Sequence, residues 1–287
     1  MTFPTYPPAQ AEPPLDPRQS LPTMYDLPSE DPKEPGLPDT FHLDQPQLLE
    51  FTFLPPGWDA EQVFTASDLN LYYDATQPRW HKRPDWFAAV GVPRLYQGRD
   101  MRLSYVVWQE RVNPFVVVEL LSPGTEDEDL GRTVQQAGEP PTKWQVYEQI
   151  LRIPYYFVFS RYTDELRAFH LVGGHYEPAE LIDGRLFIPE LQLSLGWWQG
   201  TYKSMNRLWL RWFTAQGGLI LSPGERATAA ERQLIEAQQQ VLESQQQVLE
   251  SQQQLTESQQ QLTESQQREE RLAARLRELG IDPEQLV

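Results

Sequence analysis

The sequence predicts an α/β protein of the α+β kind, with a mixed β-sheet core, a flanking helix and a separate helical tail. Two observations carry this prediction. Strand-like apolar runs lie before and after one amphipathic helix in the middle of the chain, an order that indicates a mixed sheet. The carboxyl-terminal part then repeats with a strict period of seven residues, which is typical of a coiled coil.

Composition divides the 287 residues into three segments, 1–56, 57–224 and 225–287. Residues 1–56 hold 14 of the 26 prolines and little apolar periodicity, so we expect a disordered or loosely docked arm. The absence of cysteine excludes disulfides and thiolate metal sites. Because no signal peptide or membrane-spanning run is evident, we expect a soluble cytoplasmic protein.

The formal net charge of −17 is unevenly distributed. Residues 1–78 carry 13 acidic and 2 basic side chains, and residues 216–287 carry 12 acidic and 6 basic ones. Residues 79–215 carry 16 of each. The acidity therefore lies in the flanks, and the neutral middle is compatible with a DNA partner, although it lacks the basic footprint that such a partner usually brings.

The middle segment contains most of the strand-like sequence. Residues 101–108 and 113–121 are predicted to be neighbouring strands, and the second is apolar enough for a sheet covered on both faces. Residues 140–152 start with proline and space their apolar side chains by three and four, which predicts an amphipathic helix. Further short strands are expected over residues 153–160, 165–172, 175–183, 184–189 and 191–199. Residues 208–221 are expected to form two more strands joined by a turn.

The tail contains four seven-residue repeats over residues 238–265, QQQVLES twice and then QQQLTES twice. Such a repeat favours a left-handed coiled coil, whereas glutamine in alternate core layers lowers stability and can restrict register. We expect homo-oligomerisation through residues 231–279, with a lone solvated helix as the alternative. When glutamine is assigned to heptad position a, the apolar residues fall at position d, with Glu269 interrupting the series: Leu234, Val241, Val248, Leu255, Leu262 and Leu276.

One carboxylate in an apolar strand is the main candidate for function. Glu119 lies near the end of "FVVVELL", and its burial is costly unless it is paired or binds a metal. Asp85 precedes another strand-like run, and Lys143 lies in the predicted helix. Two carboxylates on adjacent strands can hold Mg²⁺, and a lysine can orient a bound water or stabilise charge on a phosphate. On spacing alone, the alternative to a metal site is that Asp85 and Glu119 are strand caps or surface carboxylates.

Three motifs follow one another in the middle segment: "RPDWFAAVGV", "NPFVVVELLSPGTEDEDLG" and a lysine-bearing helix before "IPYYFVFSR". Together they resemble the Uma-type endonucleases of the restriction endonuclease-like PD-(D/E)xK superfamily. The resemblance covers about residues 80–200 and implies a restriction endonuclease-like mixed β-sheet core. It also implies that Asp85 and Glu119 bind the metal, Mg²⁺ or Mn²⁺, and that Lys143 is the catalytic lysine, moved from the strand onto the helix.

The chain departs from the family's pattern in three places. Leu121 stands where the usual strand lysine falls, so it would supply only its backbone carbonyl to the metal. The stretch "TVQQAGEPP" resembles an insertion before the helix, which keeps Arg132 as an alternative basic residue. The family's additional amino-terminal glutamate has no evident counterpart, and Asp68 and Asp74 are the substitutes that the sequence offers.

Two charged stretches have two interpretations each, and a group of tryptophans has one. The basic cluster at residues 81–83 can contact phosphates or form a salt-bridged surface. The acidic run at residues 126–131 is predicted to be a solvated loop, with cation binding as the alternative. The tryptophans are predicted to pack in the core: Trp197, Trp198, Trp209 and Trp212.

The expected function is that of a Mg²⁺-dependent endonuclease, which would hydrolyse DNA phosphodiesters with a metal-activated water. A dimer would suit duplex cutting because it presents two sites, and the tail offers a route to one. The alternative is a catalytically inactive nuclease-fold protein that acts through its coiled-coil tail.

Overall fold

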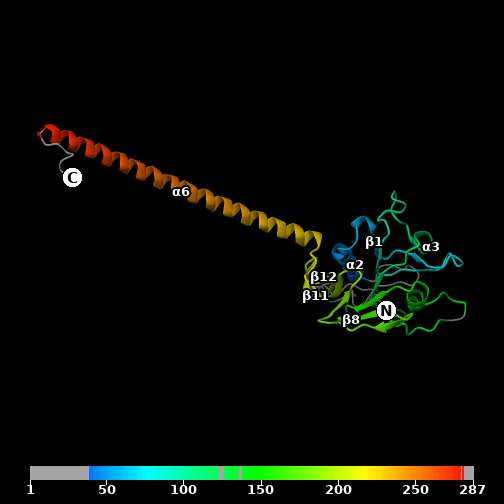
Figure 1. The fold of residues 1–287 in the computed structure, drawn as a ribbon. Coiled ribbons are helices and arrows are strands. Elements are labelled where there is room, and N and C mark those ends of the chain that lie inside the picture. Colours follow the sequence, from blue (N-terminus) through cyan, green and yellow to red (C-terminus); the bar gives the residue numbers. More distant parts are fainter. Residues whose placement is uncertain (1–38, 123–125, 136–137, 279, 281–287) are drawn as a thin grey trace, which may run out of the picture. The chain divides into compact units, whose positions relative to one another are not determined.

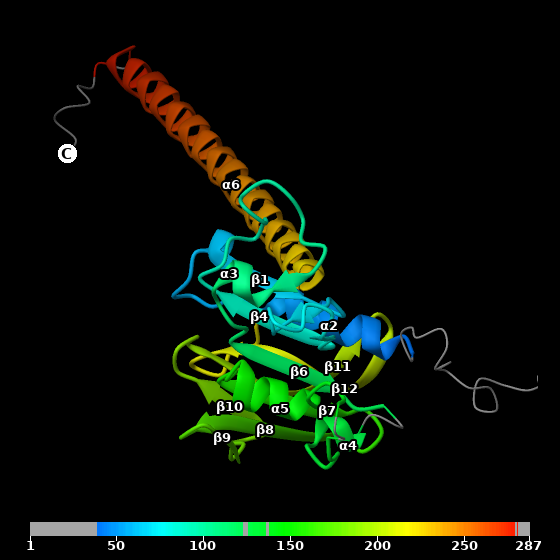
Figure 2. The ribbon, with the colours of Figure 1, turned by 90° about the vertical axis from the view of Figure 1, so that its right-hand side faces the viewer.

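The computed structural model describes residues 39–122, 126–135, 138–278 and 280 (Figures 1 and 2). The chain divides into two compact units, Met1–Ser222 and Pro223–Val287. Within the described residues, the first unit contains three β-sheets and the second contains one long helix. The predicted mixed α/β class with a carboxyl-terminal helix is confirmed.

A six-stranded sheet forms the centre of the first unit. Its neighbouring strands are antiparallel except β6 and β7, which are parallel. The crossover that joins these two contains α4 (Glu126–Asp129), α5 (Lys143–Gln145) and the π-helical turn η2 (Val146–Ile150). In spatial order the strands are β1 (Val63–Ala66), β4 (Trp86–Val90), β6 (Val116–Leu120), β7 (Tyr155–Ser160), β8 (Glu165–Val172) and β9 (His175–Pro178).

Strand periodicity explains how this sheet separates two apolar cores. Successive side chains of a strand point to opposite faces. In β6, Val116, Val118 and Leu120 join the core on one face, whereas Val117 joins the core on the other. The strand is therefore covered on both sides, as its apolar sequence predicts. The same alternation places the side chain of Glu119 on the face of Val117.

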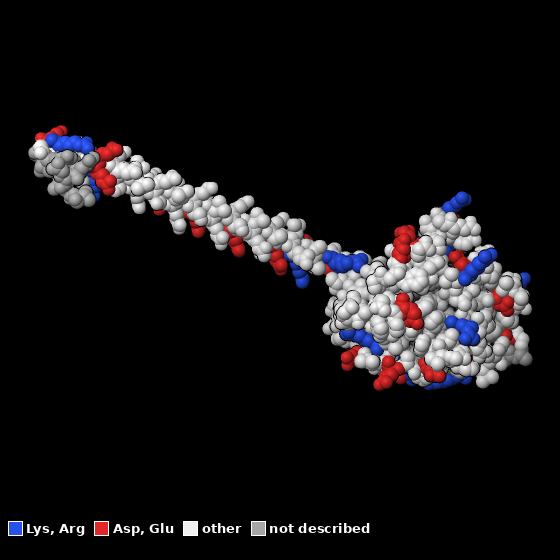
Figure 3. Space-filling view, viewed as in Figure 1, with Lys and Arg blue, Asp and Glu red and all other residues white. Residues whose placement is uncertain are grey.

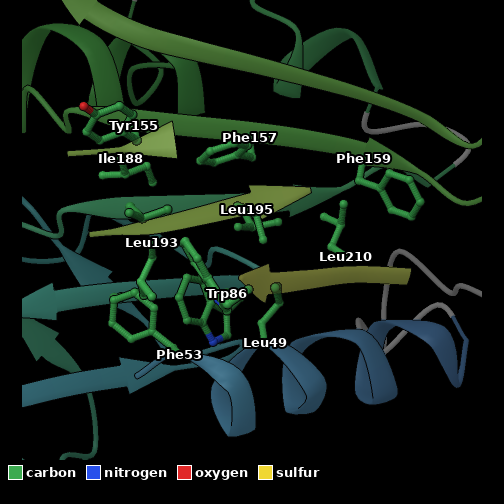
Figure 4. Close-up of a cluster of buried hydrophobic side chains, with 14 of the residues drawn as sticks. Leu49, Phe53, Trp86, Tyr155, Phe157, Phe159, Ile188, Leu193, Leu195 and Leu210 are labelled. Carbon is green, nitrogen blue, oxygen red and sulfur yellow. The ribbon is translucent and has the colours of Figure 1, made fainter. Parts of the chain in front are cut away.

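One face of the central sheet is covered by α2 (Phe41–Thr52) and by a three-stranded antiparallel sheet. Figure 4 shows Leu49 and Phe53 of this helical segment pointing toward Trp86 of β4. The rings of Phe53 and Trp86 lie 5.4 Å apart between centroids. The second sheet contains β10 (Arg185–Ile188), β11 (Leu193–Tyr202) and β12 (Met205–Thr214).

The prediction of a loosely docked arm over residues 1–56 is wrong for α2, because Leu49 is completely buried. Gln45 fixes this helix to β12: its side-chain amide donates to the carbonyl of Leu210 (2.9 Å), and its side-chain oxygen accepts from the amide of Leu210 (2.8 Å). The helix thereby satisfies backbone groups at a strand edge. Residues 1–38 of the predicted arm lie outside the described residues.

A third, small sheet contains β3 (His81–Lys82), β2 (Leu71–Tyr72) and β5 (Tyr105–Val106). The prediction of a strand over 101–108 that neighbours 113–121 is wrong, because β5 pairs with β2 and β6 lies between β4 and β7. The chain leaves β5 as α3 (Val107–Glu110), which ends at Arg111 in the left-handed conformation (φ 59°). A single 3₁₀ turn, η1 (Ala60–Gln62), leads into β1.

The region after β7 differs from the sequence prediction at residues 208–221 and at Trp197. The predicted pair of strands over 208–221 is a single strand, β12, after which Leu219 forms only an isolated bridge with Phe213. Trp197 is 37% exposed, so it is not a core residue as predicted. Two of the predicted core tryptophans are completely buried, Trp209 and Trp212.

The second unit is α6 (Pro223–Glu278), a helix with no buried side chain. Gly280 follows it with a positive φ of 77°, the conformation that favours glycine after a helix end. Pairing of this helix in a coiled coil stays a prediction. None of the described helices is both long enough and apolar enough to cross a lipid bilayer.

Candidate active site

Glu119 lies at the centre of the candidate site. It is completely buried, and its side chain points to the face of the sheet that carries α5 and η2. Its Oε1 accepts a hydrogen bond from the hydroxyl of Tyr147 (2.8 Å), and its Oε2 accepts one from the ammonium of Lys143 (3.1 Å). The alternation of side chains along β6 places this carboxylate in the interior, and two hydrogen-bond donors offset the cost of its burial.

Asp85 is the cross-strand neighbour of Glu119. Trp86 pairs with Val118 in antiparallel register, so that the next positions along the two strands bring Asp85 opposite Glu119. The amide of Asp85 donates to Glu119 Oε2 (3.3 Å), and the amide of Leu120 donates to Asp85 Oδ2 (2.6 Å). The two carboxylates that were predicted to bind a metal thus lie side by side at the end of the β4–β6 ladder.

Lys143 is brought to the site by the start of a helix. The helix predicted over residues 140–152 begins later than expected, at Lys143, where Thr142 and Gln145 form a capping box. Tyr147 follows Lys143 by four residues, a spacing that places two side chains on the same side of a helix. One helical face therefore presents both an ammonium and a phenol to the carboxylate on β6.

The acidic run 126–131, predicted to be a solvated loop, contributes a buried carboxylate that sequence reasoning missed. α4 is followed by Gly131, whose φ is 68° and against which the indole of Trp144 packs; a Cβ there would lie 2.6 Å from the ring. Asp129 is 1% exposed, and its Oδ1 lies 2.9 Å from Lys143 Nζ. The sequence indicates this buried carboxylate only through a short acidic run that ends in Leu-Gly. Of its four acidic residues, Asp129 alone is buried.

Three carboxylates surround one ammonium in this site. Burial raises the pKa of Glu119 well above its ordinary value against the attraction of Lys143, and the charges of Asp129 and Asp85 add to the rise. Burial alone would lower the pKa of Lys143, but the three carboxylates outweigh it and raise that pKa well above its ordinary value. The lysine is therefore charged, and its ammonium pairs with the buried carboxylates of Glu119 and Asp129.

His42 reaches the same site from α2, and no sequence motif indicated it. Its Nε2 lies 3.0 Å from the carbonyl oxygen of Leu120, and its Nδ1 lies 2.9 Å from Asp39 Oδ1. Both partners are acceptors, so both ring nitrogens donate, which only the imidazolium form can do. Burial lowers the pKa of His42, but the hydrogen bond to Asp39 and the charge of Asp85 outweigh it and raise this pKa.

The basic cluster at residues 81–83 forms ion pairs next to the site. Lys82 Nζ lies 2.9 Å from Glu128 Oε1, and Arg83 lies 2.7 Å from Asp68 Oδ2. The salt-bridged alternative is thus the one that the structure contains. On the face of the first unit shown in Figure 3, acidic and basic side chains are interspersed.

Of the alternative site residues, Arg132 and Asp74 have their contacts away from the buried carboxylates, whereas Asp68 lies close to Asp85. Arg132 is half-exposed and lies 3.6 Å from both Glu126 and Asp127, so Lys143 is the basic residue that contacts Glu119. Asp74 is partly exposed and accepts hydrogen bonds from its own turn, at Thr76. Asp68, the other substitute for the family's amino-terminal glutamate, forms an ion pair with Arg83, and its amide donates to the carbonyl of Pro84 (3.0 Å). Burial and the nearby charge of Asp85 raise the pKa of Asp68 despite the attraction of Arg83 and Lys143.

Leu120, rather than Leu121, has the peptide group that lies among the carboxylates. The amide of Leu121 donates to the carbonyl of Phe159 (2.8 Å), which directs this residue's backbone toward β7. The amide of Leu120 bonds to Asp85, and its carbonyl accepts from His42. The structure therefore gives the predicted Leu121 carbonyl ligand no support.

The oxygen-rich donor set fits a hard divalent cation. Asp85 and Glu119 lie opposite each other on neighbouring strands and both offer carboxylate oxygens, the ligands that such a cation prefers. Among the described residues, no group of three or more His, Asp or Glu is arranged to hold a metal by itself. A Mg²⁺ ion held here would take its other ligands from water and substrate, as this ion commonly does.

A mixed sheet that places Asp, Glu and Lys side chains together at one end of two central strands defines the class of restriction endonuclease-like proteins. The family model described as "Uma2: Putative restriction endonuclease" matches residues 24–206. This match covers more than half of the chain, which therefore belongs to the Uma2 family, as the sequence motifs indicated. No curated protein matches the chain.

Proposed function

We propose that this protein is a DNA endonuclease that uses Mg²⁺ or Mn²⁺ to hydrolyse phosphodiester bonds. The observation that carries the proposal is the meeting of Asp85, Glu119 and Lys143, which are contributed by two strands and a helix. Lys143 lies within 3.1 Å of Glu119, and the backbone of Asp85 within 3.3 Å of the same carboxylate. Membership of the Uma2 family supports the same conclusion. We expect the protein to act in the cytoplasm.

Each side chain of the site has a distinct task in this proposal. Asp85 and Glu119 would hold the cation, which when bound lowers the pKa of a water and offsets charge on the phosphate. Tyr147 donates to Glu119 Oε1 and so fixes the orientation of this carboxylate. Lys143 is held between two carboxylates and places a positive charge where the phosphate's charge would grow.

Plasmid cleavage tests the proposal. Purified wild-type protein is expected to nick or linearise plasmid DNA in Mg²⁺ or Mn²⁺, and EDTA should stop the reaction. Glu119→Gln is expected to lower the rate by more than about 100-fold, since loss of even an outer partner of a metal site costs about 10–100-fold. The matched control is Glu148→Gln, a buried glutamate that accepts from the amide of Tyr176 outside the site and should cut normally.

Two results would contradict the nuclease proposal. Equal cleavage by wild-type protein and Glu119→Gln would assign the activity to a contaminant. No cleavage of supercoiled, linear or single-stranded DNA with either metal would favour the second candidate, an inactive nuclease fold that serves as an interaction protein. That candidate is favoured by Leu121 in place of the strand lysine and by the ion pairs that neutralise Lys82 and Arg83.

Metal binding separates the two candidates without DNA. If the site is intact, calorimetric titration of the wild-type protein with Mn²⁺ is expected to show binding, and Asp85→Asn should abolish most of it because it removes one of two adjacent carboxylates. Asp74→Asn, at an exposed turn, is the control that should bind like wild type. Absence of binding in all three proteins would support the inactive scaffold.

A further inference from the structure

The exposed apolar stripe of α6 needs a partner. Its residues recur every seven positions and are 57–60% exposed, although each is aliphatic: Val241, Val248, Leu255 and Leu262. The 56-residue helix has no buried side chain. Isolated polar helices are marginal in water, and most helix stability in proteins comes from packing of an apolar face. The stripe is therefore a surface that packing against another chain would stabilise.

The remaining heptad positions show which side of α6 faces a partner. With Val241 at d, one glutamate of every heptad falls at f, on the side opposite the stripe: Glu236, Glu243, Glu250, Glu257 and Glu264. Figure 3 shows acidic side chains in a row along one side of the helix. Residues 233–267 contain no lysine or arginine. Because the charges are directed away from the stripe, two such helices can approach without like-charge repulsion at the seam.

The stripe contains hollows of the kind that receive side chains in a coiled coil. One hollow is bordered by Val241, Ser244, Gln245 and Val248. A second, one heptad further on, has the equivalent border, from Val248 through Ser251 and Gln252 to Leu255. Each border includes the d, g, a and d positions, together with one c and one further g position. The d, g, a and d positions are the four-residue hole that accepts a knob from a facing helix.

We infer that α6 pairs with α6 of a second copy of this chain in a parallel, in-register, two-stranded coiled coil. The alternation of layers decides the direction. In a parallel pair each layer contains the same position from both helices, so Gln245 meets Gln245 and Val248 meets Val248. The glutamine side chains can then hydrogen-bond to each other. An antiparallel pair would set glutamine against valine or leucine and leave a buried amide without a partner.

Threonine in the later repeats does not interrupt this surface. The hydroxyl of Thr256 donates to the carbonyl of Gln252, and that of Thr263 donates to the carbonyl of Gln259, each at 2.8 Å. These donors are satisfied within the helix, so no partner is needed for them at the seam. A parallel pair attaches both copies of residues 1–222 at the same end of the coil. This inference is independent of the proposed nuclease activity.

Cysteine cross-linking in the full chain tests direction and register, because the native sequence has no cysteine. Gln238→Cys and Gln266→Cys each place one thiol at an a position, four heptads apart. In a parallel in-register dimer each variant is expected to form a disulfide with itself on mild oxidation. Glu250→Cys, at the outward f position, is the control that should remain mostly unlinked.

Two outcomes would overturn the inference. If neither a-position variant links to itself but a mixture of the two does, the helices are antiparallel. Sedimentation equilibrium of the native chain is expected to give twice the monomer mass, and a monomer or trimer at tens of micromolar would contradict a two-stranded coil. The double variant Val248→Asp/Leu255→Asp should be monomeric, whereas Glu243→Gln/Glu250→Gln should remain dimeric.

Discussion

Replacement of Lys143 by methionine (Lys143→Met) is expected to lower the free energy of unfolding by about 3–5 kcal/mol. The lysine side chain is only 17% exposed, and its ammonium lies 3.1 Å from Glu119 and 2.9 Å from Asp129. Methionine fills much of the same volume but leaves two buried carboxylates without their cation, which is the costly way to break a buried ion pair. Urea unfolding at neutral pH without divalent ions measures the loss.

Lys82→Met is the matched control for this prediction. Lys82 Nζ lies 2.9 Å from Glu128, a distance similar to those between Lys143 and its two carboxylates, but the Glu128 side chain is 37% exposed. Water screens that pair and solvates the carboxylate left behind, so the loss should stay below about 1 kcal/mol. Equally small losses in the two variants would show that the carboxylates on β6 and α4 do not depend on Lys143.

A double variant and added metal separate charge from packing at Lys143. Glu119→Gln/Lys143→Met removes one carboxylate with the ammonium, and glutamine still offers Tyr147 an acceptor, so much of the lost stability should return. Mg²⁺ is expected to stabilise Lys143→Met more than wild type, because a divalent cation supplies the missing positive charge and binds only the folded site. Unchanged stability of Lys143→Met in Mg²⁺ would count against cation binding by Asp85 and Glu119.

The burial of Glu119 was predictable from local sequence. "FVVVELL" is apolar at every position except Glu119, and a strand covered on both faces must direct that side chain into one of its two cores. Placement of Asp85 beside Glu119 was not predictable in this way: the local pattern indicated residues 101–108 as the neighbouring strand, and only the resemblance to Uma-type endonucleases brought Asp85 and Glu119 together. The resemblance to Uma-type endonucleases also identified Lys143. The helix that carries it begins at Lys143 rather than at the prolines before it.

Asp129 and His42 were not predictable in this way, because tertiary packing decides their burial. Four acidic residues in a row read as a solvated turn, and only the contact between Gly131 and Trp144 shows which of them faces inward. His42 lies at the start of a helix that contains Pro46 and follows a proline-rich segment, a context that argues against ordered structure. Its contact with the carbonyl of Leu120 becomes evident only once the structure places α2 beside the end of β6.

The burial of α2 leads to the second prediction, which concerns Leu49→Ala. This substitution is expected to lower the free energy of unfolding by about 2–5 kcal/mol, as removal of a completely buried leucine from a packed core usually does. Leu43→Ala in the same helix is the control, because Leu43 is 52% exposed and its loss should change stability by about 0.5 kcal/mol or less. Urea unfolding of the two variants beside wild type gives both values.

Hydrogen exchange distinguishes a core helix from a docked arm even where Leu49→Ala alone would be ambiguous. If α2 is part of the core, its amides should exchange only as the first unit unfolds globally, since Gln45 and Leu49 tie the helix to β12 and to Trp86. A loosely docked arm would open by itself and exchange much faster than the amides of β6. In that case α2 could detach with His42, and the Leu120 carbonyl would lose its charged donor while the sheet stayed folded.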